Sequence, residues 1–291
     1  LFKKYNVKVG ISVDGPGELN DIRWAGNLEK TRKMTQKTEE SIEKLAAEGL
    51  NPNIIITLHR GNATKEKLPR MGDWIKKLDK IGVQTARLHL MEIENEQIRQ
   101  AYHLEPQQNI DALLYFHKLE KELTQLRFDI FYELEKLQSA EDNMLSCVWK
   151  ACDPYTTSAV RGVEGFGQRS NCGRTNKDGI DYVKAPMPNY SRYIALYHTP
   201  QEYGGCKGCR FFAMCKGHCP GTSIEGNWRN RTEHCAVWKT LFELTEKEIE
   251  AKGKIPLSKH PVLPEFEKGL LHFWSQGQNV SLEYLLTKMK N

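Results

Sequence analysis

Four of the eight cysteines stand close together in the run CKGCRFFAMCKGHCPG, residues 206–221. The other four are Cys147, Cys152, Cys172 and Cys235, so all eight lie between positions 147 and 235. Cysteines at this density can form disulfides, hold zinc, or hold iron–sulfur clusters. Which of the three is present decides whether the region stabilises the fold or is a redox centre.

Disulfides and zinc are the alternatives to a cluster. We do not expect disulfides, because the chain is long, shows no export signal, and crowds its cysteines into one region. Zinc suits C-x2-C pairs, and eight cysteines could complete two four-thiolate sites. His218 and His234, each beside a cysteine, could replace a thiolate, but we expect them to be bystanders.

The spacing of the run favours iron–sulfur ligation. In the bacterial ferredoxin run C-x2-C-x2-C-x3-C-P, the fourth cysteine serves a second cluster. Here the pattern is C-x2-C-x5-C-x3-C-P, with a longer middle gap but Pro220 in the same place. By this analogy Cys219 belongs to a different cluster from the three cysteines before it, and the remaining cysteines complete both sets. The two sets are Cys206, Cys209, Cys215 and Cys235, and Cys147, Cys152, Cys172 and Cys219.

Strand and helix patterns alternate before position 140. Strands are expected at 7–13, 53–58 and 85–91, and helices at 28–48, 65–80 and 105–137 (one helix or a pair). The run NIIITL at 53–58 is typical of a strand buried on both faces. This order implies a parallel sheet with helical crossovers, whose site residues follow the strand ends. Those positions hold Ser12, Asp14, His59, Arg60, Glu92 and Glu94.

Composition limits the partners. The net charge of +5 comes from scattered Lys and Arg, which argues against nucleic acid, and no apolar run approaches the ~20 residues of a membrane span. We therefore expect a cytoplasmic protein.

The chain begins at Leu1 and enters a strand pattern at once, so we expect it to be the C-terminal part of a longer protein. A hairpin turn is expected at 176–179, before a strand at 180–183.

The cysteine pattern resembles the SPASM domain, the auxiliary-cluster appendage of radical S-adenosylmethionine (SAM) enzymes that modify peptides and proteins. Fourteen residues separate Cys152 from Gly167 and four separate Gly167 from Cys172, ahead of the C-x2-C-x5-C-x3-C run and Cys235. The segment VGISVDGPGELND, followed by Arg23, is similar to the fourth strand of the radical SAM barrel. The resemblance covers most of residues 5–250.

The resemblance implies an α/β fold: the C-terminal half of a partial (β/α)6 TIM-like barrel, with strands four to six in residues 1–140. A cysteine-rich SPASM domain at 141–240 and a helical extension at 241–291 would follow. It implies two auxiliary [4Fe–4S] clusters, on the same two sets of cysteines as above. Ser12 and Asp14 match positions that approach the ribose and carboxylate of SAM. The alternative readings are a strand-end cap for Ser12 and a turn-capping carboxylate for Asp14.

Two departures from the family narrow the function. The chain contains no C-x3-C-x2-C motif, which holds the third, SAM-cleaving [4Fe–4S] cluster, so this piece alone is not expected to cleave SAM. Gly173 follows Cys172 where sulfatase maturases carry an Asp base, which makes that activity a less favoured alternative.

The resemblance implies a radical SAM maturase that activates a C–H bond of a ribosomally made peptide or a protein. Its partners would be that precursor and an electron donor such as ferredoxin or flavodoxin. The alternative function is a non-catalytic iron–sulfur electron carrier or a zinc-stabilised binding module.

Overall fold

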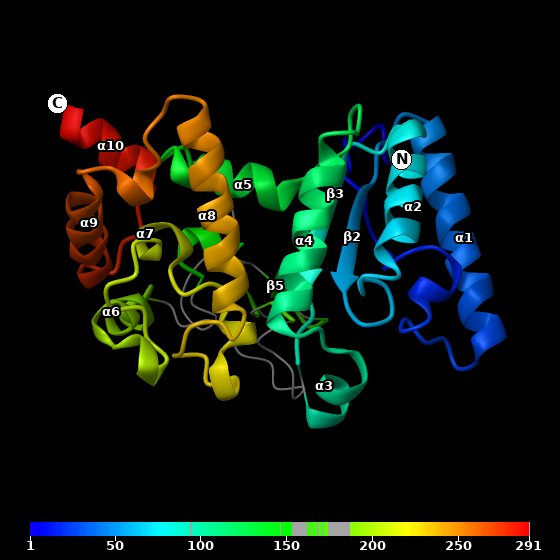
Figure 1. Cartoon of the computed structure of the whole chain (residues 1–291), viewed down its shortest axis with the longest axis horizontal. Helices are drawn as coiled ribbons and strands as arrows, with labels where there is room; N and C mark the ends of the chain where they lie inside the picture. The colour runs from blue at the N-terminus through cyan, green and yellow to red at the C-terminus, as the bar shows by residue number, and fades with distance from the viewer. Residues whose placement is uncertain are drawn as a thin grey trace. The chain divides into compact units, whose positions relative to one another are not determined.

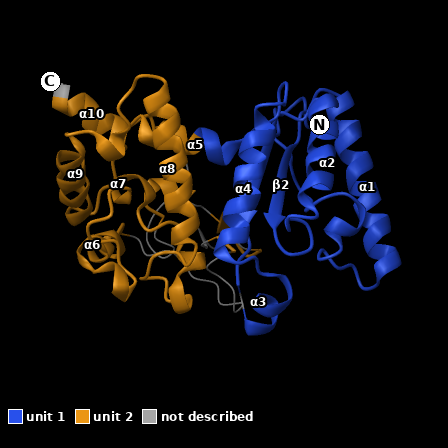
Figure 2. Ribbon diagram, in the orientation of Figure 1, with its two compact units in different colours: residues 1–132 blue, residues 133–291 orange. Residues whose placement is uncertain are grey.

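The computed structural model describes residues 1–93, 95–145, 147–152, 162–163, 165–167, 169–170, 172–173 and 187–290. The chain forms two compact units, residues 1–132 and 133–291 (Figure 2). The hairpin expected at 176–183 and the strand-end residue Glu94 lie outside the described residues. No helix in the described ranges is both long enough and apolar enough to span a membrane.

Unit 1 contains a four-stranded parallel sheet in the order β1-β2-β3-β4. The strands are β1 (Gly10–Ser12), β2 (Asn53–Leu58), β3 (Thr85–Leu90) and β4 (Arg127–Phe128). The first three fall where the sequence predicts strands, although β1 is shorter than 7–13. β4 interrupts the stretch assigned to helices, because a two-residue strand is too short to show a period of its own.

Helices connect the strands of unit 1 and cover the sheet (Figure 1). Ile54, Ile56 and Leu58 of β2 are fully buried at alternate positions, as the pleat of a strand requires. Ile55 and Thr57 on the opposite face are only half-buried, so the expectation of burial on both faces was wrong for this strand. The helices are α1 (Leu28–Ala47), α2 (Leu68–Lys80), α3 (Glu96–Tyr102) and α4 (Pro106–Glu120), with the 3-10 turn η1 (Gly17–Asn20) after β1. The helix α5 (Asp129–Gln138) follows β4, begins in unit 1 and ends in unit 2.

A buried carboxylate fixes the turn that leads into β4. Asp79, near the end of α2, accepts the backbone N–H groups of Thr124 (3.0 Å), Gln125 (2.8 Å) and Leu126 (2.7 Å). Burial alone would raise the pKa of Asp79, but these hydrogen bonds outweigh it, and the net effect is a lowered pKa. The carboxylate therefore serves as the hydrogen-bond acceptor for three consecutive backbone N–H groups of the turn.

We expect Asp79→Ala to lower the free energy of unfolding of unit 1 by about 3 kcal/mol, because three backbone N–H groups, one buried at Leu126 and two partly buried, lose their acceptor. Asp73→Ala is the matched control, since Asp73 is an exposed carboxylate on the same helix. The stabilisation by Asp79 should be present above its ordinary pKa of 3.8 and disappear as the pH falls through the lowered folded-state value. Urea unfolding between pH 2 and pH 7 measures both effects; equal midpoints for the two variants at pH 7 would contradict this role.

Unit 2 combines short segments with longer helices. Its helices are α6 (Ser191–His198), α7 (Phe212–Cys215), α8 (Cys235–Ala251), α9 (Leu263–Ser275) and α10 (Leu282–Lys290). The 3-10 turns are η2 (Cys147–Lys150), η3 (Gln201–Tyr203), η4 (Pro220–Thr222), η5 (Ile224–Gly226) and η6 (Leu257–Lys259), and β5 (Gly162–Val163) pairs antiparallel with β6 (Arg169–Ser170).

Aromatic contacts and one partly buried ion pair hold α7 and α8 in place. Phe211 stacks on Phe242 of α8 at a centroid separation of 5.1 Å, and Phe212 contacts Trp274 of α9 edge-on at 6.0 Å. Glu246, nearly inaccessible to solvent, accepts two bonds of 3.0 Å from Arg210, the residue before Phe211. These contacts anchor the segment that carries Cys209 and Cys215 to two helices.

Candidate metal centre

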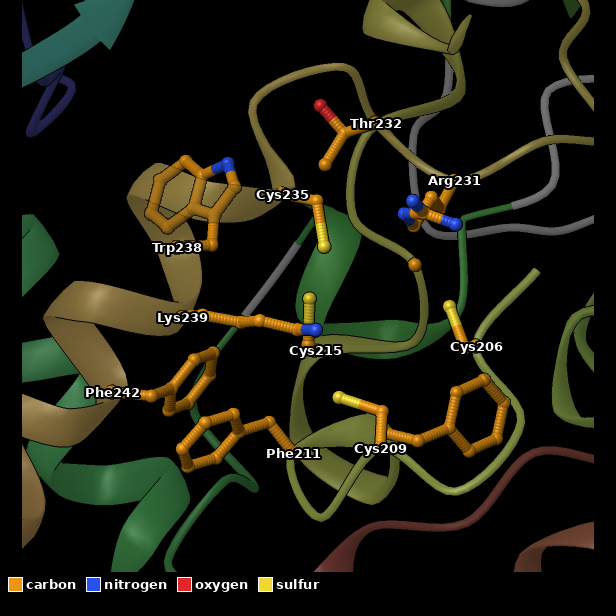
Figure 3. Close-up of a pocket in the computed structure, with 12 residues that line it drawn as sticks. Cys206, Cys209, Phe211, Cys215, Arg231, Thr232, Cys235, Trp238, Lys239 and Phe242 are labelled. Carbon is orange, nitrogen blue, oxygen red and sulfur yellow. The ribbon is translucent and has the colours of Figure 1, made fainter. Parts of the chain in front are cut away.

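Four cysteine side chains line one pocket in unit 2. Cys206 and Cys209 lie in the turns before α7, Cys215 ends α7, and Cys235 begins α8. Their sulfur atoms border the same space (Figure 3). These are the four that the sequence spacing assigns to one cluster. Cys219 is not among the described residues that line this pocket.

The backbone between Cys215 and Cys219 makes a sharp turn. Lys216, Gly217 and His218 have φ values of 52°, 74° and 58°, three left-handed residues in succession. A Cβ on Gly217 would lie 2.6 Å from a methyl carbon of Leu196, so only glycine fits there without displacement. The turn ends α7 at Cys215 and separates that cysteine from Cys219 along the chain.

A second glycine places Cys206. A Cβ on Gly205 would lie 2.0 Å from the backbone oxygen of Thr199, far inside van der Waals contact. The N–H of Cys206 donates to the carbonyl of Leu196 at 2.7 Å, which ties the cysteine to the end of α6. Close approach of these two segments therefore needs a residue without a side chain at position 205.

We expect Gly205→Ala to move Cys206 away from the pocket and to destabilise unit 2 by about 1–3 kcal/mol through overpacking. Gly173→Ala is the control, because Gly173 also adjoins a cysteine but a Cβ there meets nothing within 4 Å. Thermal unfolding and iron content after anaerobic reconstitution measure the two consequences. If both variants behave alike, the close approach at Gly205 does not position Cys206.

The pocket wall is apolar with two cations. Phe211, Phe212, Trp238 and Phe242 form the apolar part, and Arg231 and Lys239 supply positive charge. Burial, with added repulsion from Cys209 and Cys235, raises the pKa of Cys206 to about 12. Burial likewise raises the pKa values of Cys209 and Cys215. Thiolates therefore need bound positive charge in this pocket at neutral pH, which a metal group provides.

The thiols line the pocket without meeting at one point. No three His, Cys, Asp or Glu side chains in the described ranges are placed to hold a metal ion. A tetrahedral zinc site, with Zn–S bonds of ~2.3 Å, needs sulfurs only ~3.8 Å apart. In a [4Fe–4S] cluster each thiolate binds a different iron, so the sulfurs stand farther apart around a larger group. Four thiols spread around one apolar pocket fit that larger group better than a single ion.

The other four cysteines belong to other segments of unit 2. Cys147 begins η2 with a left-handed φ of 56°, and Cys152 follows η2 and is buried. Cys172 follows β6 and is half-buried, while Cys219 is buried directly before η4. As these side chains lie in the described structure, they do not form a group that could hold a metal ion. Their assignment to a second cluster stays a prediction.

Asp14 lies in a polar network beyond the ends of β1 and β2. Its carboxylate accepts bonds from Arg23 (2.9 Å) and from the N–H of Thr57 (2.8 Å), and His59 Nε2 lies 3.8 Å away. Burial opposes ionisation, but the nearby His59 and the hydrogen bonds from Arg23 and Thr57 outweigh it and lower the pKa of Asp14. The side chain is 3% exposed, and its bond from Thr57 links the ends of the two strands.

Ser12 and Asn62 complete this end of the sheet. Ser12 is the last residue of β1 and is exposed. Asn62, fully buried and not singled out by sequence reasoning, donates to the backbone oxygens of Asp14 (2.7 Å) and Thr57 (2.8 Å). An asparagine four residues beyond a strand has no distinctive local signal, because its role depends on contacts made across the sheet.

Comparison with known proteins shows which solved structures share this fold. No family model matches the chain, and no curated protein matches it in sequence. The structure of anSMEcpe, a radical SAM/SPASM sulfatase-maturating enzyme, with bound AdoMet (SAM) matches with a TM-score of 0.60 and 17% identity, over 86% of this chain and 69% of that one. The form with bound AdoMet and the Kp18Cys peptide matches with a TM-score of 0.61 and 17% identity, over 86% and 70%. The chain has a radical SAM-like fold.

The radical SAM-like fold confirms the resemblance at the level of the fold, together with the α/β class and the parallel sheet, while the half-barrel and the SPASM domain stay predictions. At 17% identity the likeness establishes the fold alone. Roles for individual residues must therefore come from this chain's own geometry.

Proposed function

We propose that the chain is part of a radical SAM maturase that modifies a ribosomally made peptide or a protein, and that it holds two auxiliary [4Fe–4S] clusters. The observation that carries the proposal is the apolar pocket lined by four thiols in a chain with a radical SAM-like fold. When bound, such clusters supply one-electron transfer at a potential tuned by burial and hydrogen bonds.

In this proposal some residues bind the clusters and others exclude water from them. The thiolates of Cys206, Cys209, Cys215 and Cys235 hold one cluster, and Phe211 and the other aromatic side chains exclude water from it. Cys147, Cys152, Cys172 and Cys219 hold the other. The ion pair between Arg210 and Glu246 keeps the cysteine segment against α8 and so fixes the ligands before the group binds.

The polar network of unit 1 gives Ser12 and Asp14 distinct proposed roles. We propose that Ser12, an exposed residue at the carboxyl end of β1, contacts SAM. Asp14 acts with Arg23 and Asn62 to hold the ends of β1 and β2 in register. Its contribution to SAM binding is then the placement of the strand ends.

The substrate we propose is a precursor peptide or protein altered at an unactivated C–H bond, with ferredoxin or flavodoxin as the electron donor and the cytoplasm as the setting. A peptide is bound in one of the matching structures, which supports this class. Gly173 stands after Cys172 where the sulfatase maturases carry an acidic base, so we favour a ribosomal peptide over a sulfatase.

The test is a co-expression experiment. The complete product of the gene is produced anaerobically with each small open reading frame encoded beside it, and the peptides are analysed by mass spectrometry. We expect one peptide to change in mass, and Cys209→Ala to abolish the change. If no peptide changes and no 5′-deoxyadenosine forms from SAM, the maturase proposal fails, and the electron carrier takes its place if clusters are bound.

A further inference from the structure

Arg231 lines the four-thiol pocket with a guanidinium group that is only partly satisfied. Its Nη1 donates to the backbone oxygens of Gln201 (2.5 Å) and Gly205 (2.7 Å). Its Nε is buried and has no hydrogen-bond partner in the described structure. The two bonds fix the guanidinium against the segment that carries Cys206, the next residue after Gly205.

A buried donor without an acceptor is costly, so its acceptor has to be sought within the pocket. Lys239, the other cation of the pocket, already donates to Gln201 Oε1 at 2.7 Å. No acidic side chain is found among the described residues that line the pocket. Arg231 and Cys206 lie on the same side of the pocket (Figure 3). The missing acceptor is therefore expected to be an anionic group held by the cysteines.

We propose that Arg231 donates its Nε–H to a sulfur of the cluster held by Cys206, Cys209, Cys215 and Cys235, and thereby raises the reduction potential of that cluster. The inference rests on the proposed iron–sulfur ligation. Sulfur in a cluster with four thiolates carries negative charge and accepts hydrogen bonds. The reduced form is more negative by one electron, so a cationic donor stabilises it more than the oxidised form. Arg231 is thus a positioning and tuning residue.

The experiment compares midpoint potentials in the 291-residue chain reconstituted anaerobically with iron and sulfide. Cys152→Ala and Cys172→Ala are present throughout, so that only the cluster beside Arg231 is measured. Dithionite is the reductant, and the reduced cluster is followed by electron paramagnetic resonance. The variants are Arg231→Gln, which removes the charge, and Arg231→Lys, which keeps the charge but loses the Nε–H. Arg229→Gln is the control, because Arg229 is exposed and lies outside the pocket.

We expect Arg231→Gln to make reduction about tenfold less favourable, a shift of about 59 mV to more negative potential for a one-electron couple. Arg231→Lys should shift in the same direction by less, and Arg229→Gln should match the parent. Iron per chain is measured in parallel, so that loss of the cluster is distinguished from a change in its potential.

Each outcome has a defined consequence. An unchanged potential in Arg231→Gln with full iron content overturns the inference and leaves the proposed function intact. If Arg231→Gln loses its iron, Arg231→Lys decides: a negative shift supports the inference, and the parent potential overturns it. A parent chain that binds neither iron nor sulfide overturns the proposed ligation and the inference together.

Discussion

Replacing Cys209 with alanine should remove one complete cluster, about half of the bound iron, while the other cluster remains. Cys209 lines the pocket together with Cys206, Cys215 and Cys235, and no spare thiol is expected to replace it. Loss of one of four thiolates leaves an iron without its protein ligand. Iron and sulfide assays after anaerobic reconstitution give the stoichiometry of parent and variant.

The matched variant is Cys172→Ala, from the set assigned to the other cluster. We expect it to lose about the same amount of iron, and the double variant Cys209→Ala with Cys172→Ala to lose nearly all. If each single variant loses as much iron and sulfide as the double variant does, the cysteines hold one shared centre, and the division into two sets is wrong.

The second large effect is expected at Arg192, a residue that is only 2% exposed. Its guanidinium donates to the backbone oxygens of Trp228 at 2.6 Å and of Asn230 at 3.0 Å, across 36 and 38 positions of sequence. These bonds attach α6 to the loop that leads to Cys235. Because a buried charged group donates both bonds, Arg192→Ala should lower the free energy of unfolding of unit 2 by about 3–4 kcal/mol.

Arg229→Ala is the control for this effect. Arg229 is exposed and only lies over the ring of Trp228, at 4.6 Å from its centroid, so its removal should cost less than about 0.5 kcal/mol. Chemical unfolding followed by tryptophan fluorescence measures both variants. A cost below about 1 kcal/mol for Arg192→Ala would show that solvent or other donors satisfy these carbonyls.

Sequence reasoning reached the features that leave a local pattern. Strands β2 and β3 stand where apolar runs predict them, and the spacing of the cysteines groups the four that line the pocket. Both signals lie in short stretches whose residue types are constrained by the element or the ligand. β4 was not predicted, because two residues are too few to show the alternation typical of a strand. Its position also depends on the carboxylate of Asp79, more than 40 residues earlier in the chain.

The residues around the sites were harder to predict, because their contacts also leave no local pattern in the sequence. Arg192 and Arg231 bind backbone oxygens that any residue type could supply, so the sequence holds no matching pattern on the other side. Asp14 could be read as a SAM contact or as a turn cap, and only the positions of Arg23 and Thr57 show how its carboxylate is engaged. Long-range polar contacts of this kind become visible only once the fold is known.

The most direct test of the central claim is the identity of the metal group. The chain is purified without oxygen from cells supplied with both iron and zinc, and its metals and acid-labile sulfide are measured alongside its Mössbauer spectrum. We expect about eight irons and eight sulfides per chain, the content of two [4Fe–4S] clusters, with spectra typical of such clusters. A colourless protein that contains zinc and no sulfide would contradict the account.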